Sequence, residues 1–584
     1  MTTFTTPTKH DRPAGTHFAE PRPRHRAVLA RGSWRRVTRR IVCGLACALT
    51  VSSLLMPSIS FAAEWVDVGG TQYNAGTAAG DDAGTWSWDG ADDMKLNGYD
   101  GGAINAAGKL NIVYEGKNTV KTEPDYTGAA IKAQDGTNQK AELNITSSNS
   151  TDELNVTAEA DAIKSTGDLS ISGPGTVNTT STNSDGIEAK GDLSITGSGT
   201  VNATGGTEGI QSKGKTTIDS SGTVIAKGGE GYGVAAGSDL IIKGGGKVEA
   251  SSIGKAAIWT KDDINISGGS QVKANSEEDY AVKAIGGLTV TNASLNAHGV
   301  GYGVYAYKGI TLDHATVTVR AAAERDDVSA LFTDEDDIVI KNGSIVDAFA
   351  EGKFSTAIST RNYNPNEAGG HIYISDSVVK AIARYAEIGG DGPACYSGDQ
   401  DGEITPERRG VNIGIFAQTS EGITPATISI VRSKVTAEGD TAAIFALAMS
   451  ADGKAIGTIE IKDATIQTPA GGKVIDYRNK EELSDGIVYE AGQTIGTGDA
   501  TIDSPYDAAV AKSTVIVPPE ETKPEGSKSE GTKTTKTVAV AAKGAKTVGK
   551  LAATGDTSNA AIVAAALAGT AAIAAGALAS RKRS

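Results

Sequence analysis

Three acidic residues occupy equivalent places in successive copies of a short phrase that recurs along the chain. Asp161, Asp185 and Glu208 each stand two residues before a branched aliphatic residue. If the copies stack, the carboxylates form a ladder in which neighbours repel by ~1 kcal/mol in water, and by more where water is thin. Such a ladder is tolerated in a fully solvated turn, and it is useful if Ca²⁺ bridges it through oxygen ligands. The sequence leaves both alternatives open.

Aromatic residues form a second recurring set further along the chain. Most of them directly follow the aliphatic residue of the phrase, which places them on the opposite side of an extended strand. The candidates are Trp259, Tyr305, Tyr307, Phe332, Phe416 and Phe445. A row of rings on a rigid surface suits the apolar faces of sugars, and it also suits wall or host proteins. The alternative is that the rings pack beneath an inserted loop or a neighbouring strand, since strands favour aromatic residues in any case.

The repeated phrase also indicates which elements would position these side chains. In each copy a small residue precedes a branched aliphatic residue, which we call the anchor. The anchors are Ile104, Ile131, Ile163, Ile187, Ile210, Val234, Ile258, Val282, Val304, Leu331, Ile358, Ile415 and Ile444. From Ile163 to Val304 they are 22 to 24 residues apart, and each unit has three short stretches rich in Thr and branched aliphatic residues. This alternation predicts strands, and the Gly, Asp, Asn and Lys between the stretches predict tight turns.

Three strands per repeat, without a helical pattern, predict an all-β fold. We expect a parallel β-helix of about 13 coils over residues 104–515, with an inserted loop at about 385–410. Irregular turn lengths favour a right-handed winding. Because the end of a β-helix exposes unpaired backbone, residues 63–103 are expected to form an N-terminal cap. This segment contains Trp65, Trp86 and Trp88. Their side chains either seal the core or stack on sugars.

The sequence pattern of the repeats resembles that of a known family. One copy reads Asp185-Gly186-Ile187-Glu188-Ala189-Lys190-Gly191-Asp192-Leu193-Ser194-Ile195, and a Gly-x-Gly-Thr-Val phrase follows it. Over roughly residues 85–300 these repeats resemble the bacterial carbohydrate-binding β-helix family, whose fold is related to that of calcium-dependent pectate lyases. The resemblance implies polysaccharide binding. It also implies that calcium could link an acidic polysaccharide to Asp161, Asp185 and Glu208.

Pectin-cleaving enzymes share this kind of fold, so catalysis has to be tested on the residues themselves. The pairs Asp262-Asp263 and Asp336-Asp337 fall at the turn that reads Gly-Asp in other copies. This position indicates turn residues of the repeat rather than a catalytic acid and base. The sequence lacks the Asn-Thr-Asp, Gly-His-Gly and Arg-Ile-Lys phrases of polygalacturonases, and it has no Ser-His-Asp, Cys-His or zinc-like spacing. We expect no enzyme activity. A polysaccharide lyase, which needs only calcium and one basic residue, is the alternative.

The N-terminal segment predicts export. Residues 1–62 join a basic stretch to an apolar run and a small-residue cleavage site, which is the order of a secretory signal peptide. The formal net charge of the chain is −15, and removal of this basic segment leaves a more negative exported part. Such a surface repels nucleic acid, so we expect no nucleic-acid partner.

The C-terminal segment, residues 551–584, carries a three-part pattern after a Pro-, Lys- and Thr-rich linker at 516–550. An apolar span at 560–579, long enough to cross a bilayer, is followed by a basic tail. The pentapeptide before it is Leu551-Ala552-Ala553-Thr554-Gly555. This segment resembles the sorting signal of Gram-positive cell-wall proteins, in the variant associated with class E sortases of actinobacteria. The resemblance implies cleavage after Thr554 by a sortase and attachment to peptidoglycan; a plain membrane anchor is the alternative.

Together these patterns predict an extracellular, cell-wall-anchored surface protein. We expect it to bind a polysaccharide or host glycan in adhesion or substrate capture. A protein-binding adhesin that uses the same face is the first alternative, and a tethered calcium-dependent polysaccharide lyase is the second.

Overall fold

A computed structural model of the 584-residue chain describes residues 63–137, 140–323, 327–362, 369–385, 412–419, 426–439, 442–448, 458–467, 500–503, 508–510 and 513–517. These ranges all belong to one compact unit, Met1–Pro519, and every regular element in them is a β-strand. Four predicted features lie outside the described residues: the signal peptide, the inserted loop beyond Tyr385, the linker beyond Val517 and the sorting signal. Within the described ranges, no helical segment has the length and hydrophobicity needed to span a bilayer.

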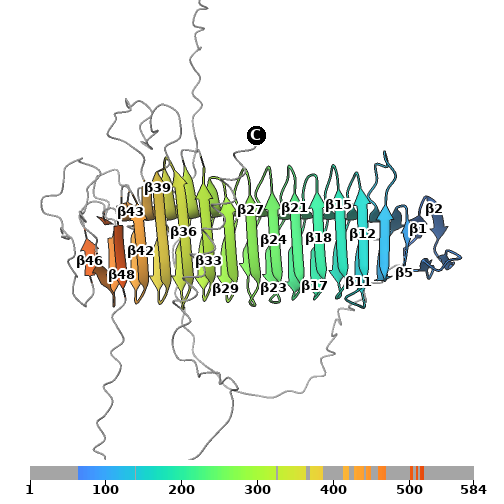
Figure 1. Ribbon diagram of the computed structural model, residues 1–584, viewed down its shortest axis with the longest axis horizontal. Coiled ribbons are helices and arrows are strands. Elements are labelled where there is room, and N and C mark those ends of the chain that lie inside the picture. Colours follow the sequence, from blue (N-terminus) through green and yellow to red (C-terminus); the bar gives the residue numbers. More distant parts are fainter. Residues whose placement is uncertain are drawn as a thin grey trace, which may run out of the picture. The chain divides into compact units, whose positions relative to one another are not determined.

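The strands form three long sheets, in which equivalent strands of successive coils lie side by side (Figure 1). The sheet that holds the anchors, called the anchor sheet, contains β2 (Thr71–Asn74), β1 (Trp65–Val68), β7 (Ile104–Ala107), β10 (Ile131–Gln134), β13 (Ile163–Ser165), β16 (Ile187–Ala189), β19 (Ile210–Ser212), β22 (Val234–Ala236), β25 (Ile258–Thr260), β28 (Val282–Ala284), β31 (Tyr302–Ala306), β34 (Val328–Thr333), β37 (Ser355–Asn362), β40 (Asn412–Thr419), β43 (Ala442–Ala448) and β47 (Ala508–Val510).

The other two sheets complete each coil. The second sheet contains β3 (Ala79–Gly80), β4 (Trp86–Trp88), β5 (Asp93–Asn97), β8 (Lys109–Glu115), β11 (Glu142–Ser147), β14 (Asp168–Ser172), β17 (Leu193–Gly197), β20 (Thr216–Ser220), β23 (Leu240–Lys243), β26 (Ile264–Ile266), β29 (Gly287–Thr291), β32 (Gly309–Asp313), β35 (Ile338–Lys341), β38 (Ile372–Ser375), β41 (Thr427–Val431), β44 (Thr458–Lys462) and β46 (Ala500–Asp503). The third sheet contains β6 (Asp100–Gly101), β9 (Lys117–Lys121), β12 (Glu153–Ala158), β15 (Thr176–Ser181), β18 (Thr200–Gly205), β21 (Thr223–Gly228), β24 (Lys247–Ser252), β27 (Gln271–Ser276), β30 (Ser294–Gly299), β33 (Thr316–Ala322), β36 (Ile345–Gly352), β39 (Val378–Tyr385), β42 (Lys434–Gly439), β48 (Ser513–Val517) and β45 (Thr465–Gln467).

The predicted anchors set the register of the anchor sheet. Each anchor pairs with the anchor of the next coil in a parallel ladder that runs from Ile104 to Ile444. All of them are buried. The parallel β-helix with three strands per coil, predicted from the repeat spacing, is therefore confirmed. The right-handed winding stays a prediction.

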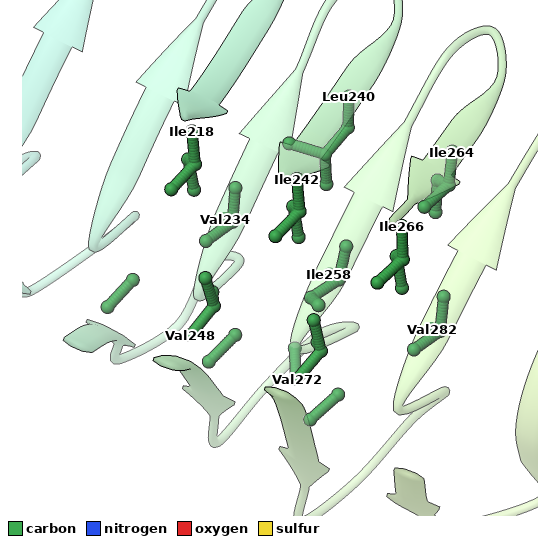
Figure 2. Packing of buried hydrophobic residues seen from close by; sticks show 14 of the residues in the cluster. Ile218, Val234, Leu240, Ile242, Val248, Ile258, Ile264, Ile266, Val272 and Val282 are labelled. Atoms are coloured by element: carbon green, nitrogen blue, oxygen red, sulfur yellow. The ribbon is translucent and has the colours of Figure 1, made fainter. Parts of the chain in front are cut away.

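The core is a set of aliphatic ladders, one per sheet, that meet inside the coil. Figure 2 shows Val234, Ile258 and Val282 of the anchor sheet pointing toward the side chains of the other two sheets. Each fully buried Val, Leu or Ile contributes about 1.5–3 kcal/mol relative to an exposed one. Because every coil repeats this burial, the outer side chains sit on a rigid and evenly spaced scaffold.

The turn aspartates join neighbouring coils through hydrogen bonds. Asp168 Oδ1 accepts a hydrogen bond from the backbone N–H of Asp192 at 2.8 Å. Asp263 Oδ1 does the same for Gly287 at 2.8 Å, and Asp337 Oδ1 for His371 at 2.9 Å. Each of these carboxylates thus binds the backbone of the next coil, which fits the interpretation of the aspartate pairs as turn residues of the repeat.

Antiparallel strands terminate the stack. At the N-terminal end β1 pairs antiparallel with β7, and β4 with β5. Trp86 and Trp88 are buried against the core there, so they seal this end as predicted. Trp65 differs: Val66 and Val68 of β1 face the core, and the alternation of the strand leaves the indole of Trp65 on the outer face, half-buried. Of the two alternative roles, sealing of the core therefore does not apply to Trp65.

At the other end, strands fold back on the last parallel coils. β47 pairs antiparallel with β43, β46 with β44, and β48 with both β42 and β45. β48 ends at Val517, two residues beyond the boundary expected at 515. Reversed strands at both ends interrupt the parallel ladder, which limits edge-to-edge pairing with other chains.

Candidate functional site

Two columns of side chains lie next to each other on the outer face of the anchor sheet. One column is the residue after each anchor, and the other is the residue two positions before it. Their adjacency is shown within single coils: Lys164 Nζ lies 2.6 Å from Asp161 Oδ2, and the Tyr302 and Tyr305 rings are 6.0 Å apart. We call these two columns, from Asp161 to Phe332, the outer strip. It contains all three acidic candidates and three of the six aromatic candidates.

The first part of the outer strip is charged, and three of its carboxylates, those of Asp161, Asp185 and Glu188, are buried. Lys164 Nζ bridges two carboxylates, at 2.6 Å from Asp161 Oδ2 and 2.5 Å from Glu188 Oε2. Lys190 also pairs with Glu188. Burial by itself would raise the pKa of the Asp161 carboxyl, but Lys164 and a hydrogen bond from Ser184 together bring that pKa below its usual value. The Lys164 ammonium is stabilised in turn, and its pKa is raised.

Among the described residues, no lysine or arginine forms an ion pair with Asp185 in the next coil. Its side chain is 5% exposed, and its Oδ1 accepts hydrogen bonds from the Thr207 hydroxyl and from the Glu208 backbone N–H at 3.1 Å. Burial, together with the nearby Glu208 carboxyl, raises the pKa of Asp185 to about 7. Asp161 and Asp185 are thus buried, and a fully solvated turn does not describe this place.

The residue that sequence reasoning missed is Glu188. Its carboxylate, not that of Glu208, forms a close group with those of Asp161 and Asp185, in which one oxygen from each residue lies within 4.8 Å of the other two. The repeat places Glu188 in the column after the anchor, and no local motif indicates that the two columns touch. The register of the coils could have shown it, because Lys164 and Glu188 are direct neighbours in adjacent coils.

The donor set only partly fits a calcium ion. Carboxylate oxygens in a close group are the ligands that Ca²⁺ prefers. However, the Lys164 and Lys190 ammonium groups already neutralise Asp161 and Glu188. The remaining negative charge is concentrated on Asp185 and Glu208, whose mutual repulsion a proton or a divalent cation would relieve. A cation would therefore act on Asp185 and Glu208 more than on Asp161.

The middle of the outer strip is aromatic. The Tyr232 and Trp259 rings stack 5.3 Å apart with 21° between their planes. Lys255 Nζ lies 4.8 Å from the Tyr232 centroid, and Lys283 Nζ lies 4.3 Å from the Tyr280 centroid. These contacts hold the rings in place while all three rings stay partly open to solvent. Because the rings are only half-buried, they offer an apolar surface flanked by ammonium groups.

The far end of the outer strip is a hydrogen-bonded aromatic cluster. The Tyr302 hydroxyl donates to Asp327 Oδ2 at 2.7 Å, and the Tyr305 hydroxyl donates to Asp334 Oδ2 at 3.1 Å. Burial and these carboxylates raise the pKa of both hydroxyls well above the usual value for tyrosine. The Phe332 ring packs against both tyrosine rings, at 5.4 Å from Tyr302 and 5.7 Å from Tyr305, and it is buried.

Arg361 and Tyr307 border this cluster. The Arg361 guanidinium lies 4.5 Å from the centroid of the Phe332 ring, so Phe332 is packed on that side. Arg361 also approaches Asp327 and Asp334 at 3.8 and 3.7 Å. Tyr307 directly follows β31, and its hydroxyl donates a hydrogen bond to Glu335 Oε1. Of the candidates in this region, Tyr305 and Tyr307 keep partly exposed rings and Phe332 does not.

Phe416 and Phe445 have a packing role. Their rings stack 5.5 Å apart with 22° between their planes, and both side chains are buried. With Ile413 and Ala442 they form a small hydrophobic cluster that is separate from the main core. The structure therefore assigns these two candidates to structural packing, which was the alternative to a ligand surface.

Comparison with known proteins agrees with part of this picture. Residues 100–240 match the model of a family described as "Carbohydrate-binding domain-containing protein". The match includes the charged part of the outer strip and Tyr232, and it stops before Trp259. No curated protein and no solved structure matches this chain. The family similarity supports carbohydrate binding by the matched coils.

Proposed function

We propose that this chain is a cell-wall-anchored surface protein that binds a polysaccharide along the outer strip, in adhesion or substrate capture. One observation carries the proposal: a single rigid face presents partly open rings beside buried carboxylates and lysines, in register over successive coils. The match of residues 100–240 to a carbohydrate-binding family supports it independently.

The chemistry of the strip suits a sugar chain. The half-buried rings of Trp259 and Tyr305 can stack on the apolar face of a pyranose. Carboxylates and ammonium groups near them accept and donate hydrogen bonds to sugar hydroxyls. Since the rings are already fixed by neighbours in adjacent coils, little side-chain entropy is lost on binding.

Calcium is proposed as a helper of this binding at Asp185 and Glu208. An ion there would neutralise the pair and could share its remaining coordination sites with an acidic polysaccharide. The proposal predicts that binding of an acidic glycan depends on calcium and that binding of a neutral glycan does not.

A role without catalysis is part of the proposal. Its support is that the turn aspartates Asp168, Asp263 and Asp337 are engaged with backbone N–H groups of the next coil. In the outer strip, Asp161 and Glu188 are held by lysines. Asp185 accepts hydrogen bonds from the Thr207 hydroxyl and the Glu208 backbone N–H. A tethered lyase is the competing activity, and it would release unsaturated sugars that absorb in the ultraviolet.

The cell-wall location is proposed from the signal-peptide pattern at residues 1–62 and the sorting-signal pattern at residues 551–584. A sortase of class E type would cut after Thr554 and join the chain to peptidoglycan. Replacement of Thr554 by Ala should then shift the protein from the wall fraction that resists hot detergent to the soluble or membrane fraction. An unchanged wall-linked fraction would contradict sortase anchoring and favour another form of attachment.

The binding test uses purified full-length protein and immobilised plant, mucin and bacterial wall polysaccharides. Bound protein is measured with calcium and with chelator, and the supernatant is assayed for released sugar. Retention that falls in Trp259→Ala supports the outer strip as the site. The matched control is Tyr373→Ala, an exposed aromatic residue on the second sheet. Released unsaturated product would show a lyase, and retention by deglycosylated proteins alone would show a protein-binding adhesin.

A further inference from the structure

A hollow of about 610 Å³ lies at the N-terminal end of the anchor sheet, on the same outer face as the strip. β1, β7 and β10 supply its floor, and the β9–β10 connection supplies one wall. Its size falls in the range of pockets that hold small ligands. The lining residues on which the argument rests are Trp65, Asp67, Asn105, Glu123, Tyr126 and Lys132.

The hollow is continuous with the columns already described. Asn105 and Lys132 are the residues after the first two anchors, and Lys132 pairs in register with Lys164 of the outer strip. On the other side, Asp67 of β1 is the antiparallel partner of Asn105. At ~4.8 Å per strand, Lys132 and Trp259 are roughly 24 Å apart along the face. A single extended polymer could therefore occupy both places.

The aromatic groups of the hollow are placed for contact with a ligand. Trp65 is turned away from the core by the alternation of β1. Tyr126 is 37% exposed, yet two contacts hold its side chain in place. Its hydroxyl accepts a hydrogen bond from Asn105 Nδ2 at 3.0 Å, and its ring packs over Gly128. A Cβ at position 128 would lie only 2.7 Å from that ring. An exposed ring that is held this closely loses little entropy when it stacks on a ligand.

The polar groups around these rings are of the kind that bind hydroxyls. Asp67 and Glu123 supply carboxylate acceptors, Lys132 supplies donors, and Asn105 supplies an amide. Acceptors and donors of both charges around two aromatic rings suit a ligand that is neutral or weakly charged, has hydroxyls on its edge and has an apolar face. A pyranose sugar has these properties.

We propose that this hollow is a second binding site, a subsite for one pyranose unit of the polysaccharide that lies on the outer strip. Trp65 and Tyr126 provide the stacking surfaces, and Asn105 positions Tyr126. The inference rests on the proposed glycan binding, and it adds a place that neither the family similarity nor the aromatic row along the strip assigns.

The test titrates full-length protein with cellohexaose, xylohexaose and hexagalacturonic acid by calorimetry. For the hexasaccharide that binds, Trp65→Ala and Tyr126→Ala should each weaken affinity about tenfold. Trp65→Phe, which keeps a ring, should recover most of the loss. Gly128→Ala should also weaken binding although Tyr126 is still present, because the new methyl group displaces its ring. Tyr373→Ala serves as the control and should bind normally.

A fluorescence measurement locates the sugar at the hollow. In the Trp259→Phe background, the hexasaccharide should change tryptophan emission, and Trp65→Phe should remove that change. If Trp259→Ala weakens binding but the Trp65, Tyr126 and Gly128 variants bind normally, the subsite is refuted while the outer strip stands. If no glycan binds the unaltered protein, both proposals fail. If the Trp65 variants lose binding to deglycosylated protein and not to sugars, the hollow is a protein site and the inference is overturned.

Discussion

The rings of Tyr280 and Tyr302 stack 5.0 Å apart with 13° between their planes, although the two residues come from successive coils. This distance follows from the backbone, because parallel strands lie ~4.8 Å apart and aromatic rings prefer a similar separation. A parallel β-helix can therefore build a continuous aromatic surface simply by repeating a residue type at one position. The surface exists before any ligand arrives, and its rings are held by one another.

Replacement of Trp259 by Ala should weaken glycan binding without unfolding the protein. The indole stacks on Tyr232 but remains half-buried, so its loss removes about 1 kcal/mol of ring contact with a sugar and little core packing. Calorimetric titration with the best polysaccharide should show a roughly fivefold lower affinity. Tyr373→Ala is the matched control. Equal affinity of Trp259→Ala and the unaltered protein would remove the aromatic part of the strip from the site.

Phe445→Ala should have the opposite signature. The side chain is 4% exposed and stacks on Phe416, so truncation leaves a cavity and lowers the free energy of unfolding by about 3–5 kcal/mol. Denaturant unfolding measures this loss. Glycan affinity of the folded variant should be unchanged, since the ring is covered. Weaker binding with normal stability would show that Phe445 reaches the ligand after all.

The alkaline behaviour of Tyr302 follows from the burial of its hydroxyl and from its contact with Asp327. Its hydroxyl pKa is raised in the folded protein above the value of about 10 expected in the unfolded chain. Stability from this group is therefore complete below pH 10 and is lost as the pH rises further, because the unfolded chain releases the proton more easily. Thermal unfolding between pH 9 and 12 should show a steeper decline for the unaltered protein than for Tyr302→Phe.

A spectroscopic titration gives the independent check. Absorbance at 295 nm reports tyrosinate, and Tyr302→Phe should leave the ionisation near pH 10 unchanged while removing a transition at higher pH. If the variant instead loses absorbance near pH 10, Tyr302 titrates normally and its hydroxyl is not shielded by burial and Asp327.

The sequence predicted the fold well because period is a strong signal. Anchors such as Ile163 and Val304 recur at nearly constant spacing, and a one-residue error in register would turn every inward side chain outward. The same logic does not reach Trp65, since the cap lies outside the repeat and only the pairing of β1 with β7 decides which way the indole points.

The site was only partly predictable for a related reason. Asp161 and Asp185 were found by their repeated position, but the ion pair between Lys164 and Asp161 depends on two columns meeting across a bend that no local pattern reveals. The bridge from Lys164 to Glu188 lies within one column and follows from the register of the coils. Phe416 and Trp259 hold equivalent positions after their anchors, yet one is buried and the other is partly open. Exposure at such positions is set by neighbouring segments and not by the repeat.

Asp185→Asn should stabilise the protein at neutral to alkaline pH. The native carboxyl has its pKa raised to about 7 by burial and by Glu208, whereas in the unfolded chain it titrates near its usual 3.8. The folded state therefore binds the proton more tightly, and the unaltered protein loses stability from this group as the pH rises from about 4 to about 7. Asparagine keeps an oxygen that can accept from Thr207 and carries no charge. In the presence of chelator, the melting temperature of the Asp185→Asn variant should exceed that of the unaltered protein at pH 8. The difference should be smaller at pH 5.

Calcium provides the second half of this test. An ion that bridges Asp185 and Glu208 stabilises the folded state in proportion to its occupancy, so millimolar calcium should raise the melting temperature of the unaltered protein at pH 8. The rise should shrink at pH 5, where a proton competes with the ion for Asp185, and it should be absent in Asp185→Asn. Asp161→Asn is the control with the opposite sign: it deprives Lys164 of a partner and should lower stability at pH 8 while keeping the response to calcium. An equal calcium response in Asp185→Asn would place the ion elsewhere on the chain.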